Sequence, residues 1–141
     1  MVENSLVNQI KEIISKGAIS ADPDDILKIF EMHKQISEEV EYLKQDLNEE
    51  EMGCQVIFSD LDKKYWVNAS NGTVEYGEGK IKKPPIFISA SKEDVIGLFL
   101  GEVDANIISP LGRLKAGGNI KTLRAYQEYY EDAIEEFKKR Y

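Results

Sequence analysis

Apolar and polar positions alternate in two short stretches of the chain that are separated by an apolar segment. Residues 86–90 alternate with a period of two, with Phe87 and Ser89 on the face opposite the other three, as is typical of a half-buried strand. Residues 111–116 alternate in the same way, with Arg113 and Lys115 on one face, and predict another strand. Both stretches therefore belong to a predicted sheet.

The segment between these strands predicts a short helix that is apolar on all sides. Ser91 and Asp94 have the spacing of a capping box at its start, and Gly101 is suited to end it. Val95, Leu98 and Phe99 share one side, and further apolar residues lie on the others. Such a helix must be covered all round, so it is deeply buried, or part of it faces a partner, a membrane or an apolar ligand.

Helical periodicity also predicts a helix at each end of the chain. Residues 4–16 form an amphipathic helix that Gly17 can end. Gly117 and Gly118 permit a sharp reversal after the second strand, and Asn119 is a good N-cap for a last helix that continues to the C-terminus. One broad face of that helix is apolar and includes Ile120, Leu123, Tyr126, Tyr130, Ala133, Ile134, Phe137 and Tyr141.

A regular apolar stripe predicts a long helix over residues 23–48. Apolar residues and the only histidine recur at alternating steps of three and four, at Ile26, Ile29, His33, Ile36, Val40, Leu43 and Leu47. Leu27 and Phe30 widen the stripe, which favours packing on a sheet over a free coiled coil. A homodimer formed through this stripe remains an alternative.

Strand signals also fill residues 55–76. Residues 55–58 alternate, residues 65–68 are rich in strand formers, and Asn71-Gly72 is a strong hairpin signal before a return strand at 73–76. With the two later strands this makes five. The chain therefore reads as one α+β domain over residues 1–141, with a helical part at 1–50 and the sheet and further helices at 55–141.

Composition narrows the class of protein. The chain has 42% hydrophobic and 31% charged residues and a net charge of −8, which argues against general nucleic-acid binding. No apolar run is long enough for a membrane span, so we expect no stable membrane insertion. No secretory signal is visible, and the single cysteine, Cys54, cannot form an internal disulfide. Both observations favour a cytoplasmic location.

No motif predicts catalysis, a cofactor or a metal. His33 has no second histidine to form a metal pair, and no nucleophile motif lies near it. Gly72 and Gly77 are spaced as in a phosphate-binding loop, but Glu78 stands where lysine is needed. The glycines after Lys115 could offer amides to an anion, although a plain turn is the stronger interpretation. We therefore expect a protein that is not an enzyme.

The order of these elements resembles the sterol carrier protein 2 family of lipid-transfer domains. The resemblance is carried by Trp66-Val67, by Asn71-Gly72, by residues 91–101 and by residues 111–119, and it spans roughly residues 55–130. The helix before Gly17 is an addition to that pattern. Residues 102–110 also depart from it, because they lack the polar short helix expected before the last strand.

The resemblance implies a five-stranded, largely antiparallel sheet covered by helices, with an apolar cavity between the two. It also implies non-catalytic binding or transfer of a fatty acyl group, sterol or similar lipid. We expect the cavity to be lined by Trp66, Phe87, Val95, Leu98, Phe99, Ile107, Leu114, Leu123 and Tyr126. The alternative function is an oligomerisation or regulatory module that uses the stripe from Ile26 to Leu47.

Overall fold

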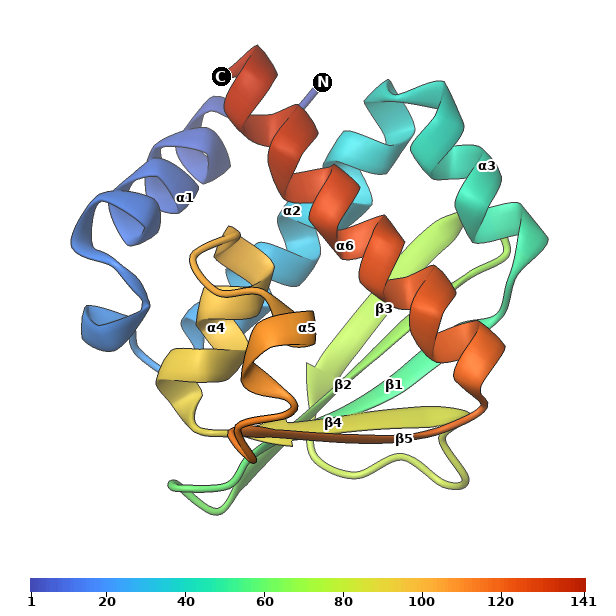
Figure 1. Ribbon diagram of the computed structural model, residues 1–141. Helices are drawn as coiled ribbons and strands as arrows, with labels where there is room; N and C mark the ends of the chain where they lie inside the picture. The colour runs from blue at the N-terminus through green and yellow to red at the C-terminus, as the bar shows by residue number, and fades with distance from the viewer.

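The computed structural model describes residues 1–141, which form one sheet with helices packed on one of its faces (Figure 1). The helices are α1 (Asn4–Lys16), α2 (Asp25–Glu39), α3 (Glu41–Glu49), α4 (Lys92–Leu100), α5 (Ala105–Ile108) and α6 (Ile120–Arg140), with a 3-10 turn at Ala18–Ser20. The strands are β1 (Met52–Phe58), β2 (Lys63–Ser70), β3 (Thr73–Glu78), β4 (Ile86–Ala90) and β5 (Leu114–Gly118).

The sheet has the order β3-β2-β1-β4-β5. The β1–β4 pair in its centre is parallel, with Cys54 opposite Ile86, and the other three pairs are antiparallel. The predicted α+β class and the largely antiparallel five-stranded sheet are therefore confirmed. The β2–β3 hairpin turns at Asn71 and Gly72, whose φ angles are 53° and 78°, as the Asn-Gly signal predicts.

The helices cover the face of the sheet that carries the large apolar side chains. Val56 and Phe58 of β1 and Val67 of β2 are fully buried on this face, within one contiguous apolar core. The predicted caps hold the helices in place. The Ser91 hydroxyl accepts a hydrogen bond from the amide of Asp94, and the Asn119 side chain accepts one from the amide of Thr122.

The opposite face of the sheet carries no helix (Figure 1). The register aligns five residues across it, in the order Gly77, Trp66, Gln55, Phe87 and Gly117. The Trp66 ring lies over Gly77, and the Phe87 ring lies over Gly117. A Cβ on Gly117 would stand only 2.6 Å from the Phe87 ring, so this position needs a glycine. The Gln55 side chain holds the connection between β3 and β4 on this face, donating to the Gly79 carbonyl and accepting from the amide of Ile81.

The long predicted helix is two helices, which corrects the single helix at residues 23–48. Val40 separates α2 from α3 with an extended backbone, at φ −108° and ψ 112°. The break lets α3 turn toward the β2–β3 hairpin, where the Leu47 carbonyl accepts a hydrogen bond from the amide of Gly72. Every residue of the stripe is buried within the chain: Ile26, Ile29, His33, Ile36, Val40, Leu43 and Leu47.

Two further details differ from the sequence prediction. Asp94 does not reach back to close a capping box, because both of its carboxylate oxygens accept hydrogen bonds from Arg113, at 2.6 and 3.1 Å. This ion pair joins α4 to the start of β5, which begins at Leu114 rather than at residue 111. A short helix, α5, is also present in the segment where the sequence did not predict one, and the Asp104 side chain caps it.

Candidate functional site

A pocket of about 380 Å³ lies between β4, β5, α5 and α6. The sheet contributes Ile88, Leu114 and Ala116, and α6 contributes Tyr126 and Tyr130 among others. Apart from Ala116, these residues are buried, so they form the inner wall. The exposed lining residues Asn106, Ser109, Pro110, Ile120 and Arg124 mark the mouth. The pocket is thus apolar inside and mixed at its entrance.

The local sequence explains why the pocket forms at this place. At the end of β5, the left-handed Gly118 and the N-cap Asn119 turn the chain so that α6 begins at once and crosses the sheet. Ala116 of β5 and Ala105 of α5 supply small side chains where larger ones would fill the space under α6. The pocket is therefore a gap that small residues leave between well-formed elements.

An aromatic cluster closes the inner end of the pocket. The rings of Phe99 and Tyr130 have centroids 4.9 Å apart, and those of Tyr126 and Tyr130 are 5.4 Å apart, both with edge-to-face geometry. Phe99 and Tyr126 are fully buried. Such contacts make a rigid apolar wall, which favours a ligand with a hydrocarbon part.

The hydroxyl of Tyr126 is buried and has no hydrogen-bond partner. Burial, with smaller contributions from Cys54, Tyr129 and Tyr130, raises the pKa of this phenol well above its usual value, so it stays a neutral donor. An unpaired buried hydroxyl costs about 1–3 kcal/mol of stability. Tyr126 thus carries one unsatisfied hydroxyl that is fully buried in the core.

Burial also keeps two other ionisable groups of the interior, Cys54 and His33, in their neutral forms. Burial raises the pKa of the Cys54 thiol to about 12, so the reactive thiolate is absent at neutral pH. Burial lowers the pKa of His33 to about 3, and neither of its ring nitrogens has a partner. His33 packs among the rings of Phe30, Phe99 and Tyr129, away from the pocket lining. No cluster of three His, Cys, Asp or Glu side chains is placed to hold a metal ion.

The structure brings some of the nine expected cavity residues together. Leu114, Leu123 and Tyr126 line the pocket. Phe99 stands directly behind them, against Tyr126 and Tyr130. Val95 and Leu98 are buried on α4 and contribute to the core rather than to the lining, and Ile107 is 64% exposed beside the mouth.

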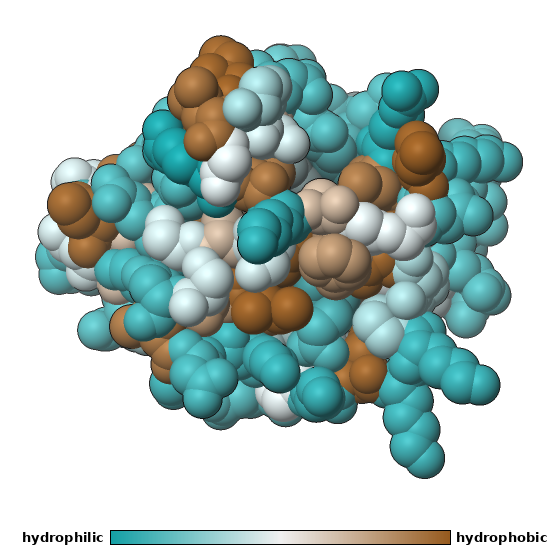
Figure 2. Space-filling model, turned by 60° about the horizontal axis from the view of Figure 1, so that its bottom comes forward, coloured by the Kyte–Doolittle hydropathy of each residue, from teal (hydrophilic) through white to brown (hydrophobic).

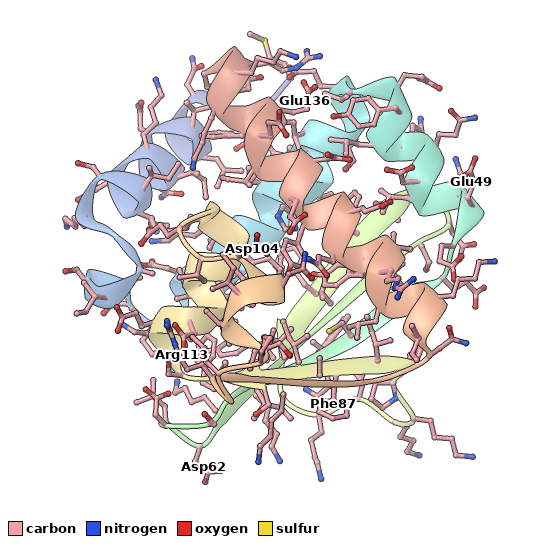
Figure 3. The ribbon with its side chains drawn as sticks, viewed as in Figure 1. Glu49, Asp62, Phe87, Asp104, Arg113 and Glu136 are labelled. Atoms are coloured by element: carbon pink, nitrogen blue, oxygen red, sulfur yellow. The ribbon has the colours of Figure 1, made fainter.

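Trp66 and Phe87 lie on the other face of the sheet, so their placement in the cavity is corrected. Strand side chains alternate between faces, and the buried neighbours Val67 and Ile88 already occupy the helix-covered side. Phe87 is 38% exposed, and Figure 3 shows it on the side of the sheet away from the helices. The alternation was visible in the sequence, but which face the helices cover was not.

Sequence reasoning also missed several lining residues. Tyr130 lies four positions after Tyr126 on the same face of α6, so helical spacing could have identified it. Ile88 could have been found from its strand parity, since it shares a face with Ile86. Ala105 carried no signal, because nothing in the sequence placed its short helix over the sheet.

Comparison with known proteins gives a structural likeness only. No protein-family model and no curated protein matches the chain. The sterol carrier protein domain 2 of Helicoverpa armigera matches with a TM-score of 0.63 and 18% identity, over 82% of this chain and 94% of that domain. Palmitated SCP2L2 from Aedes aegypti matches with a TM-score of 0.54 and 14% identity, over 72% of this chain and 90% of that one.

A larger protein contains a similar unit. The sec-alkylsulfatase Pisa1 from Pseudomonas sp. matches with a TM-score of 0.54 and 18% identity, over 62% of this chain. The match covers only 14% of the sulfatase chain. The same arrangement of sheet and helices thus occurs both in small domains and as a small part of an enzyme. The present chain has the fold of the sterol carrier protein 2 domains.

Proposed function

We propose that this protein binds the apolar part of a lipid, such as a fatty acyl chain or a sterol, in the pocket between β4, β5, α5 and α6. The observation that carries the proposal is the apolar inner wall of a pocket that is open at one end. Its volume of about 380 Å³ lies within the range of roughly 300–1,000 Å³ that is usual for small-molecule sites.

The chemistry of the lining supports non-covalent binding. The pocket is lined by no acidic residue, histidine or cysteine, so it holds no pair of a nucleophile and a base. Arg124 at the mouth is its one charged residue and can attract the acidic head of a fatty acid whose chain lies inside. A palmitated relative of the same fold, from Aedes aegypti, supports acyl chains as the first ligands to test.

Occlusion of the pocket tests the proposal. Leu123→Trp places a bulky ring in the lining, and we expect at least a tenfold loss of affinity for palmitate, measured by titration with carboxyl-labelled palmitate and NMR. Leu61→Trp is the matched control, because Leu61 is an exposed residue in the β1–β2 turn, outside this pocket. We expect the control to bind as the parent does.

Two results would reject the proposal. One is the absence of palmitate and cholesterol binding up to millimolar ligand, together with no lipid retained by the purified protein in native mass spectrometry. The other is equal binding by Leu123→Trp and the parent, which would place the lipid elsewhere on the molecule. Circular dichroism of both variants shows whether they keep the fold.

A further inference from the structure

Charge is strongly segregated along this acidic chain. Residues 79–92 and 105–124 contain eight of its 18 basic residues and none of its 26 acidic residues. All of the acidic residues therefore lie in the remaining parts of the chain. Such segregation concentrates positive charge in these two segments of a protein of net charge −8. Two acidic residues from outside them lie nearby: Glu51 lines the same pocket as Lys82 and Lys83, and Glu50 accepts a hydrogen bond from Thr122.

The two segments lie side by side in the fold. β4 belongs to the first and β5 to the second, and the two strands pair antiparallel, with Phe87 opposite Gly117. The second segment also contains α5 and the first residues of α6. Together they form the edge of the sheet at β5, the mouth of the pocket, and the connection that crosses the open face of the sheet beside Trp66 and Asn68 of β2. We call this surface the β5 edge surface.

Most of the positive charge on the β5 edge surface is free. Two of the eight basic residues are used internally: Arg113 pairs with Asp94, and Lys92 donates to the carbonyls of Ile19 and Ala21. The other six are exposed and form no ion pair. They are Lys80, Lys82, Lys83, Lys115, Lys121 and Arg124.

The same surface carries exposed apolar side chains around the pocket mouth. Ile107, Leu111 and Ile120 are 64%, 65% and 68% exposed. Ile120 lines the pocket, and the other two directly follow Asn106 and Pro110, which line it as well. In Figure 2, which brings the open face of the sheet forward, brown apolar groups stand among teal hydrophilic side chains. Phe87 adds an exposed aromatic ring on that face (Figure 3).

We propose that the β5 edge surface docks on an anionic lipid bilayer, with the mouth of the pocket turned toward the lipid. Free lysines attract anionic head groups, and the aliphatic side chains enter the boundary between head groups and acyl chains. A nucleic acid would satisfy the lysines but would leave three exposed aliphatic side chains at the mouth without an apolar partner. The bilayer accounts for both the lysines and the apolar side chains. This docking proposal rests on the proposed function only for the identity of the lipid that would pass through the mouth of the pocket.

Vesicle co-sedimentation tests the docking. We expect the protein to bind vesicles of phosphatidylcholine mixed with phosphatidylserine, to bind phosphatidylcholine alone much more weakly, and to be released by high salt. The triple variant Lys82→Gln, Lys83→Gln, Lys115→Gln should reduce partitioning onto the anionic vesicles about a hundredfold, since each cation near the surface contributes about fivefold. The double variant Ile107→Ser, Leu111→Ser should weaken partitioning at least tenfold even at low salt.

A charge-matched control variant shows whether vesicle binding depends on the β5 edge surface or on the overall charge of the protein. Lys11→Gln, Lys34→Gln, Lys44→Gln removes the same charge from α1, α2 and α3, where none of the three lysines is ion-paired. We expect this control to keep almost all of the vesicle binding. Equal losses in the two lysine variants, or no binding of the parent to anionic vesicles, would overturn the proposal.

Two further measurements distinguish the remaining outcomes. If single-stranded polyuridylate binds more tightly than the vesicles, and the serine double variant does not weaken that binding, the surface is a nucleic-acid site and the bilayer proposal fails. Palmitate titration of the Lys82, Lys83 and Lys115 variant shows whether the loss of vesicle docking is independent of ligand binding, because none of the three lysines lines the pocket. Unchanged palmitate affinity with lost vesicle binding is the result we expect.

Discussion

The two ends of the helix-covered face differ in how completely side chains fill them. Under α2, Ile29, Phe30 and Ile36 are fully buried, and the pocket beside this helix is lined by other residues of α2, such as Glu31 and Gln35, with Tyr76 of β3. Under α6, near β5, Ala105 and Ala116 leave a pocket of about 380 Å³. One sheet thus supports a solid core at one end and a hollow at the other, and the size of the facing side chains decides which forms.

Truncation should affect the two ends very differently. Phe30→Ala empties a fully buried site among Phe99, Tyr76 and His33, and we expect a loss of about 3–5 kcal/mol in the free energy of unfolding. Leu123→Ala enlarges a hollow that already exists at a half-buried position, so the loss should be about 1 kcal/mol. Urea denaturation measures both, and similar losses would show that the two ends are packed alike.

Buried His33 makes the stability of the core under α2 sensitive to acid. Its pKa is about 3 in the folded protein and about 6.5 in the unfolded chain, so folding requires the neutral ring. The contribution of the neutral His33 ring to the free energy of unfolding is complete above pH 6.5, the pKa of the unfolded chain. It falls by about 1.4 kcal/mol per pH unit as the pH drops from there toward 3, the pKa in the folded protein.

His33→Leu removes the ionisable group while it keeps an apolar side chain in the core. Between pH 6.5 and 5, the parent should lose roughly 2 kcal/mol more than this variant. The measurement is urea denaturation at a series of pH values, with His33→Ala as a control for the change in volume. Parallel pH curves for the parent and His33→Leu would show that the ring is not buried in its neutral form.

The smallest expected changes in stability come from removing the hydroxyl groups of two tyrosines on α6. Tyr129 is hydrogen-bonded to the Ser37 hydroxyl at 2.6 Å and donates to the His33 carbonyl, whereas the Tyr126 hydroxyl has no partner. Tyr129→Phe should therefore cost about 1 kcal/mol, while Tyr126→Phe should leave stability unchanged or raise it by up to about 1 kcal/mol. Equal losses in thermal denaturation would mean that Tyr126 has a partner in solution.

Much of the fold could be predicted because its signals are local. The Asn71-Gly72 hairpin, the Ser91 and Asn119 caps, and the left-handed Gly101 each depend on a few adjacent residues, and each is present. The break at Val40 could not be predicted, because the apolar stripe continues through it without interruption. The position of α3 depends instead on distant contacts with the β2–β3 hairpin.

The site was only partly predictable for a similar reason. Helical spacing predicted an apolar face of α6 that includes Leu123 and Tyr126, and both residues line the pocket. Periodicity separates the two faces of a strand but does not say which face the helices will cover, and this ambiguity put Trp66 and Phe87 in the wrong layer. The pocket itself depends on Ala105 and Ala116, and small residues carry little sequence signal.

The parallel pairing of β1 with β4 has a consequence for how the molecule opens. The hairpin of β2 and β3 closes through neighbouring residues, whereas the β4–β5 half joins it through contacts such as Cys54 with Ile86, far apart along the chain. Long-range pairing of this kind forms late in folding, because the entropy of closing a long loop must be lost first. Amide hydrogen exchange should thus be faster in β4 and β5, the two strands that line the pocket, than in β1 and β2.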